Sequence, residues 1–247
     1  MVGKGQVIVS TQQKPERATK VTFEDFDYVF LLTYARSGST LLQSLLNSEP
    51  TALIRGENNN ALFYMFKALE AVTMSKTQHG QHPTEPDTPW FGAEKLTPLG
   101  FKRTILRQFV NGVLRPTPTA KVLGFKEIRH IPFFMNDLDF ENYCQFLLNS
   151  FPNAKLIFNS RDAEDVRKSA WLKELNPELV KRGVRAADER FRLATARFDN
   201  VLHLQYEDYV ENHDEVKKLF KFVGFEYDAA RVEAIFNKRL THAKLTD

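Results

Sequence analysis

The segment that decides the fold, residues 28–46, has the sequence YVFLLTYARSGSTLLQSLL. It opens with an almost uninterrupted apolar run, which is typical of a strand covered on both faces. A turn of small residues, Ser37–Thr40, comes next, and leucines then recur on one helical face at positions 41, 42, 45 and 46. The segment therefore predicts a strand, a small-residue turn and a helix in direct succession.

The same alternation of strand and helix continues downstream. Further strands are predicted at residues 121–125, 154–159 and 201–205, and helices at residues 140–150, 165–171 and 214–223. Gly224 stands where a glycine commonly ends a helix. Strands that alternate with helices predict an α/β fold, with a central parallel sheet and helices on both faces.

Length and composition predict one folded domain. Of the 247 residues, 43% are hydrophobic and 26% charged, which excludes wholesale disorder. Residues 1–22 are polar and aperiodic, so we expect a loose lead-in followed by a single domain over residues 23–247. Residues 73–98 contain four prolines and are expected to form a long loop. We expect a lid or a wall of the acceptor site there, pinned by a buried Trp90 and Phe91.

Charge, cysteine content and hydropathy exclude several classes. With 34 Lys and Arg against 31 Asp and Glu, the net charge of +3 does not favour general nucleic-acid binding. The single Cys144 excludes an intramolecular disulfide and is expected to be a core thiol. No apolar stretch approaches the ~18 residues of a membrane span, and the run at residues 7–9 is shorter than the ~7 of a signal peptide. We therefore expect a cytoplasmic protein.

The turn after the first strand has the composition of a phosphate-binding loop. Small residues at Ser37–Thr40 let backbone N–H groups converge on an anion at a helix N-terminus, and Arg36 adds a full cation. The alternative is an ordinary turn with Ser39 as the helix N-cap. The turn is not a Walker A loop, because Thr33 stands at that motif's first glycine and Ser39 at its lysine.

A second candidate anion site follows the strand at residues 154–159. Arg161 leaves the end of that strand, where ligands of open α/β sheets bind, and Ser169 lies eight residues further on. The two side chains can hold one anion only if the intervening chain folds back. The alternative is a surface ion pair of Arg161 with Asp162 or Asp165.

Together these motifs resemble those of sulfotransferases. Residues 33–40 (TYARSGST) resemble the family's 5′-phosphosulfate loop, T-Y-P-[RK]-S-G-[ST]-T, with Ala35 in place of proline. Residues 161–169 resemble its 3′-phosphate motif. Residues 206–209 (YEDY) and 222–225 (FVGF) resemble the family's Tyr-Glu-Asp-Leu and Phe-Leu-Gly-Leu. The resemblance extends from about residue 28 to 225 and implies the sulfotransferase fold, with a P-loop-like nucleotide-binding core.

The resemblance implies a donor and the residues that bind it. The donor is 3′-phosphoadenylyl sulfate (PAPS), whose sulfuryl group passes to a hydroxyl or amine and leaves 3′,5′-adenosine bisphosphate. In the family pattern Arg36 and the amides of Ser37, Gly38, Ser39 and Thr40 hold the 5′-phosphosulfate, Arg161 and Ser169 hold the 3′-phosphate, and Tyr206 borders the adenine. The family's C-terminal Arg-Lys-Gly loop and Gly-x-Trp-Lys stretch are absent. Lys238, Arg239 and Lys244 are the alternative ligands for the 3′-phosphate, but a cationic tail is more often solvated, and we expect that here.

The catalytic base implied by the resemblance is Glu57. The stretch Arg55-Gly56-Glu57 resembles one in tyrosylprotein and carbohydrate sulfotransferases, where a glutamate removes the acceptor proton. A carboxylate is ionised at neutral pH and able to accept a proton. The alternative is a surface acid or helix cap, and His79 and His82 are the competing bases.

Lys126 is the second catalytic candidate. It matches a family lysine at a strand end that neutralises charge on the transferring sulfonate and the leaving oxygen. The alternative is a surface pair with Glu127. Arg36 and Lys126 supply the charge that Mg²⁺ supplies in kinases, so no metal is expected.

The acceptor class follows from a further resemblance. Residues 90–93 (WFGA) ahead of residues 124–127 (GFKE) are similar to bacterial cell-surface polysaccharide sulfotransferases. A carbohydrate hydroxyl is therefore the expected acceptor, with a small phenol or a tyrosyl peptide as alternatives. Two other functions stay open: a phosphotransferase of the P-loop type and a non-catalytic nucleotide-binding module.

Overall fold

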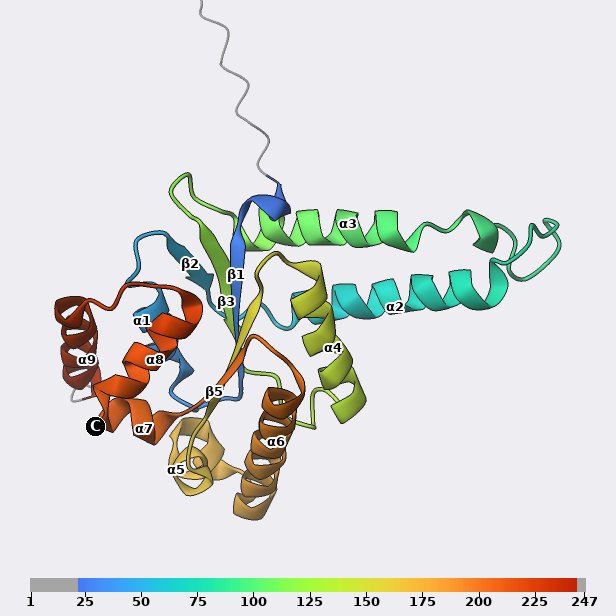
Figure 1. Ribbon diagram of the computed structural model, residues 1–247. Helices are drawn as coiled ribbons and strands as arrows, with labels where there is room; N and C mark the ends of the chain where they lie inside the picture. Colours follow the sequence, from blue (N-terminus) through green and yellow to red (C-terminus); the bar gives the residue numbers. More distant parts are fainter. Residues whose placement is uncertain (1–21, 244–247) are drawn as a thin grey trace, which may run out of the picture.

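A five-stranded sheet forms the centre of the protein (Figure 1). The computed structural model describes residues 22–243, without the side chains of residues 170, 171 and 239–243. The strands are β1 (Asp27–Thr33), β2 (Ala52–Arg55), β3 (Val122–Glu127), β4 (Lys155–Ser160) and β5 (Val201–Gln205). Their order is β2-β3-β1-β4-β5, and every neighbouring pair is parallel. The four predicted strands are confirmed, and β2 is an addition that the sequence did not predict.

Helices cover both faces of the sheet, as predicted. Alternate β1 residues enter two separate cores: Tyr28, Phe30 and Leu32 point into one, and Val29 and Leu31 into the other. The first core is closed by α2 (Ala61–His79), α3 (Pro98–Phe109), α4 (Asp137–Ser150), α5 (Ala163–Lys168) and α6 (Pro177–Arg197). The second is closed by α1 (Ser39–Leu46), α7 (Tyr206–Glu211), α8 (His213–Val223) and α9 (Ala229–Ala243).

Two local predictions hold in detail. Cys144 is fully buried among apolar side chains of α4, as expected for a core thiol. Gly224 ends α8 with φ of 84°, a left-handed conformation that glycine adopts without steric cost. Residues 1–21 of the expected lead-in, and Lys244, lie outside the described residues.

The expected long loop at residues 73–98 is only partly a loop. Its first seven residues belong to α2, which continues to His79 because its sequence contains neither proline nor glycine and Gly80 follows as the C-cap. A 3₁₀ turn forms at Ala93–Lys95, and α3 begins at Pro98, a favoured first helical residue. α2 and α3 form a hairpin that projects from the sheet, with the connecting segment at its far end (Figure 1). The prediction that Trp90 and Phe91 are buried was also wrong, because their side chains are 47% and 57% exposed, respectively.

The carboxyl ends of the strands lie at one edge of the sheet. β1 is the central strand, and the chain builds β2 and β3 on one side of it and β4 and β5 on the other. The loops after β1 and its neighbours therefore lead to opposite sides of the sheet. Open α/β sheets bind ligands in the crevice between such loops. Among residues 22–243, no helix has both the length and the apolar character needed to cross a membrane.

Candidate active site

The turn between β1 and α1 bends sharply at the carboxyl edge of the sheet. Arg36 and Gly38 both have left-handed backbones, with φ of 66° and 83°. Ser37 lies buried between them, its Oγ 2.8 Å from Thr33 Oγ1, and its carbonyl accepts a hydrogen bond from Asn159 Nδ2 at 2.7 Å. β4 therefore supports the turn from below. The N-cap of α1 is Gly38, so the alternative of a turn capped by Ser39 is wrong.

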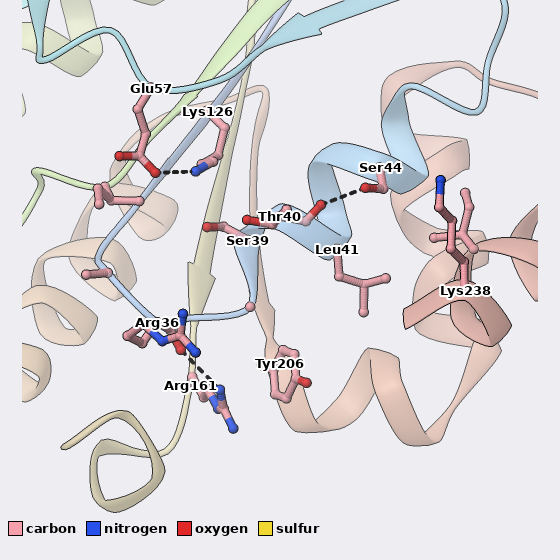
Figure 2. A pocket seen from close by; sticks show the side chains of 14 residues that line it. Arg36, Ser39, Thr40, Leu41, Ser44, Glu57, Lys126, Arg161, Tyr206 and Lys238 are labelled. Carbon is pink, nitrogen blue, oxygen red and sulfur yellow. Dashed lines mark hydrogen bonds and ion pairs between the residues drawn. The ribbon is translucent and has the colours of Figure 1, made fainter. Parts of the chain in front are cut away.

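Two arginines from different loops meet beside this turn. Arg36 Nε donates to Ser169 Oγ at 2.8 Å. Arg161 Nη1 donates to the carbonyl oxygen of Arg36 at 3.2 Å (Figure 2). The predicted pair of Arg161 and Ser169 thus flanks Arg36, and Ser169 bonds to Arg36. The acidic neighbours of Arg161, Asp165 and Glu207, lie 4.0 Å from its guanidinium, too far for a hydrogen bond.

Tyr206 joins the arginine and the turn. It is the first residue of α7, and its ring centroid lies 4.5 Å from the guanidinium carbon of Arg161. A guanidinium over a tyrosine face is attracted by the ring quadrupole. The same ring lies against Gly38, where only a residue without a side chain leaves room for it. Arg161, Tyr206 and Gly38 therefore form one packed group at the mouth of the turn.

Glu57 and Lys126 face each other on the other side of the turn. Strand pairing aligns Arg55 of β2 with Phe125 of β3, so the residues just beyond them emerge side by side. Lys126 Nζ lies 2.5 Å from Glu57 Oε1 (Figure 2). The Lys126 side chain is 6% exposed and that of Glu57 40% exposed. The alternative pair of Lys126 with Glu127 is wrong, and Glu57 is not a helix cap because the N-cap of α2 is Asn60.

These groups surround one cavity of about 720 Å³ (Figure 2). Side chains from the carboxyl edge and from α9 line it: Ala35, Arg36, Gly38, Ser39, Thr40, Leu41, Ser44, Glu57, Lys126, Ile128, Arg161, Tyr206, Ile235 and Lys238. Among the side chains that the structure describes, four cations and one carboxylate, Glu57, line the cavity. Such a wall favours a ligand with several negative charges.

Comparison with known proteins assigns the family. A model of the sulfotransferase family matches residues 28–229. The chain belongs to the sulfotransferase family. The solved structure of sulfotransferase STF9 from Mycobacterium avium is similar to this sulfotransferase, with 14% identity and a TM-score of 0.44 over 88% of this chain and 68% of that chain. No curated protein sequence gives a significant match.

The cavity of this sulfotransferase contains most of the predicted site residues. Ser37 and Ser169 are outside its lining, and the first of them is buried beneath the turn. Two residues of α9, Ile235 and Lys238, also line it, and Lys238 is exposed, as expected of a solvated side chain. Ser44 also escaped prediction, and its position one helical turn after Thr40 was the available signal.

The hairpin connection takes no part in this cavity. No residue of 73–98, all of which the structure describes, lines it, and the expected lid or acceptor wall stays a prediction. The Trp90 ring instead stacks on His79, with centroids 3.8 Å apart and planes at 5°. The competing bases His79 and His82 are therefore separated from the described cavity.

Proposed function

We propose that this sulfotransferase transfers the sulfuryl group of PAPS to a carbohydrate hydroxyl, with Glu57 as the general base. The observation that carries the proposal is the Glu57–Lys126 pair, 2.5 Å apart, on the wall of the cavity that also receives the turn after β1. A carboxylate that can accept a proton and a cation that can stabilise the leaving group thus line the same cavity, which supports the proposal.

The distribution of charge supports a nucleotide donor. Arg36 and the N-terminus of α1 suit the phosphosulfate end, since backbone N–H groups and a cation converge there. Arg161 offers a cation for the second phosphate, and the adjacent Tyr206 ring offers an aromatic surface for the adenine. The volume of about 720 Å³ is within the ~300–1,000 Å³ usual for small-molecule sites.

The proposed reaction is an in-line displacement at sulfur. The acceptor oxygen forms a bond to sulfur while the bond between sulfur and the phosphate oxygen breaks, and the acceptor proton passes to the Glu57 carboxylate. The electron pair of the broken bond stays on 3′,5′-adenosine bisphosphate. Lys126 and Arg36 stabilise the negative charge that grows on that oxygen, which is the usual role of preorganised cations. Lys126 holds Glu57 Oε1, which leaves Oε2 for the acceptor proton.

A carbohydrate is the proposed acceptor because the base is open to solvent. Glu57 is 40% exposed, so a hydroxyl carried on a long chain can reach it without the whole acceptor entering the cavity. The similarity of residues 90–93 and 124–127 to bacterial cell-surface polysaccharide sulfotransferases also supports this acceptor class. A small phenol and a tyrosyl peptide are the alternatives that the assay compares.

The decisive assay is transfer of radiolabelled sulfate from PAPS to a panel of glycans, a phenol and a tyrosyl peptide. We expect a glycan to be labelled, and Glu57→Gln to lower turnover by ~10²–10⁴, the usual contribution of general acid–base catalysis. The affinity for 3′,5′-adenosine bisphosphate should stay unchanged. Glu85→Gln, an exposed position outside the cavity, is the control.

Three results would contradict the proposal in different ways. Labelling of the phenol or peptide alone would change the acceptor class. Wild-type turnover in Glu57→Gln would place the base elsewhere. Transfer of phosphate from ATP with Mg²⁺, or nucleotide binding without any transfer, would favour the phosphotransferase or the binding module.

A further inference from the structure

A second glutamate, Glu127, is buried beside the proposed catalytic pair but does not line the cavity. It is the last residue of β3, directly after Lys126. Because neighbouring strand residues point to opposite sides, Lys126 faces the cavity while Glu127 faces the segment that connects β2 to α2. Nothing in the proposed reaction uses this carboxylate.

Both oxygens of Glu127 accept hydrogen bonds. Oε2 accepts the amide N–H groups of Asn58 at 3.0 Å and Asn60 at 2.9 Å. Oε1 accepts the amide of Ile128 at 2.8 Å and a longer contact from Arg129 Nη1 at 3.4 Å. One buried side chain thus links the backbone of two segments, residues 58–60 after β2 and Ile128 after β3.

The segment that Glu127 holds is the one that carries Glu57. Asn59 and Asn60 both have left-handed backbones, with φ of 57° and 58°, so the chain turns tightly straight after Glu57. Asn60 is the N-cap of α2, and its own side chain makes no capping bond. The Glu127 carboxylate accepts the amide of this N-cap residue, and Asn58 Oδ1 accepts the amide of Ala61, so the carboxylate lies at the positive end of a 19-residue helix.

The charge on Glu127 fits this position. Burial on its own raises the pKa of a carboxyl group, but the amides of Asn60, Ile128 and Asn58 outweigh burial and lower the pKa of Glu127. The ionised group accepts at both oxygens, whereas a neutral amide would turn an N–H group toward one set of donors. Glutamine is therefore a poor substitute despite its equal size.

We propose that Glu127 is a positioning residue for catalysis: it clamps residues 58–60 so that Glu57 meets Lys126 and the acceptor. The inference rests on the proposed role of Glu57 as the base. Lys126 and Glu127 are neighbours in one rigid strand, so β3 sets the positions of both members of the catalytic pair, one directly and one through the clamp.

A double-mutant cycle tests the clamp. Glu127→Gln alone should lower turnover by up to about 10²-fold, the cost of a displacement near 1 Å. Its affinity for 3′,5′-adenosine bisphosphate should stay within about twofold of wild type, because the turn after β1 and Arg161 are untouched. In a Glu57→Gln background, Glu127→Gln should add no further loss. Glu141→Gln, in an ion pair with Arg197 on the outer side of α4, is the control.

The cycle separates failure of the clamp from failure of the proposed function. Equal losses from Glu127→Gln in both backgrounds, with Glu57→Gln itself impaired, would overturn the clamp. Wild-type turnover in Glu57→Gln would instead overturn the proposed base.

Amide hydrogen exchange in the wild-type protein gives a readout that needs neither turnover nor a folded variant. The amides of Asn58 and Asn60 should exchange more slowly than that of Asn59, which bonds to neither Glu127 oxygen. In Glu127→Gln this protection should be lost. Equal exchange of the three amides in the wild type would overturn the clamp.

Discussion

The ring of Tyr206 lies directly on Gly38, so that a methyl carbon at position 38 would come within 2.1 Å of Tyr206 Cδ2. The backbone of Gly38 is also left-handed, with φ of 83°. Two separate requirements therefore select glycine here, and both serve the same end. They bring the turn after β1, the aromatic face and Arg161 together at one wall of the cavity.

Gly38→Ala should lower both stability and nucleotide affinity by more than Gly92→Ala does, although both glycines have left-handed backbones. The left-handed backbone alone costs about 1–2 kcal/mol, and the contact with Tyr206 adds to that cost. Gly92→Ala is the matched control, because Gly92 has the same φ of 83° and nothing lies within 4 Å of its added carbon. Melting temperature and calorimetric affinity for 3′,5′-adenosine bisphosphate measure the difference. Equal effects of the two variants would mean that Tyr206 moves aside freely.

Arg161→Ala should weaken binding of the bisphosphate without unfolding the protein. Loss of a charge-assisted hydrogen bond to a phosphate costs on the order of 1.5–3 kcal/mol. Arg161→Lys keeps the charge but loses the planar contact with Tyr206, so its affinity should be intermediate. Arg167→Ala, whose guanidinium pairs with Glu164 outside the cavity, is the control. An affinity equal to wild type in Arg161→Ala would remove this arginine from the nucleotide site.

Lys126→Ala should slow turnover by a different route from Glu57→Gln. Removal of one preorganised donor at a developing charge costs about 10²–10³ in turnover. A more acidic acceptor needs less help with its proton, so it should rescue Glu57→Gln and leave the Lys126→Ala defect in place. Rates against a series of phenols or alcohols of graded acidity measure this contrast. Lys95→Ala, on the projecting hairpin, should match wild type, and rescue of Lys126→Ala by acidic acceptors would contradict the assigned roles.

Acid should destabilise the protein through His130. Burial lowers the pKa of His130 to about 4, although contacts with Glu127 and Thr33 oppose that shift. Between about pH 6.5 and 4 the unfolded state binds the proton that the folded state refuses, so the free energy of unfolding falls as pH falls. The total is about 3 kcal/mol for such a shift, and His203, whose pKa burial also lowers, adds in the same direction.

Denaturant unfolding across this pH range measures the effect. His130→Asn should flatten the slope of unfolding free energy against pH, whatever it does to stability at neutral pH. His82→Asn, at an exposed position on the hairpin connection, should leave the slope unchanged. An unaltered slope in His130→Asn would assign the acid sensitivity to other groups.

The elements that were predictable from sequence are those with a strong local pattern. The run at residues 28–46 specifies its strand, turn and helix by itself, because two-sided burial demands a continuous apolar strand and a helix face repeats every three to four residues. Cys144 and Gly224 were equally clear, one from its apolar neighbours and the other from its place after a helix. The motifs of the turn and of Glu57, Lys126, Arg161 and Tyr206 could likewise be found by inspection.

Only the tertiary structure decided which of these residues meet. β2 has four residues and a single buried side chain, too weak a pattern to predict, yet its register against β3 places Glu57 beside Lys126, 69 positions away in the chain. The same holds for Ser169 on Arg36 and for Lys238 of α9 at the cavity wall. The residue types and local elements were determined by sequence periodicity. The site was determined by strand order and register, because contacts between distant segments depend on which strands pair and where each one ends.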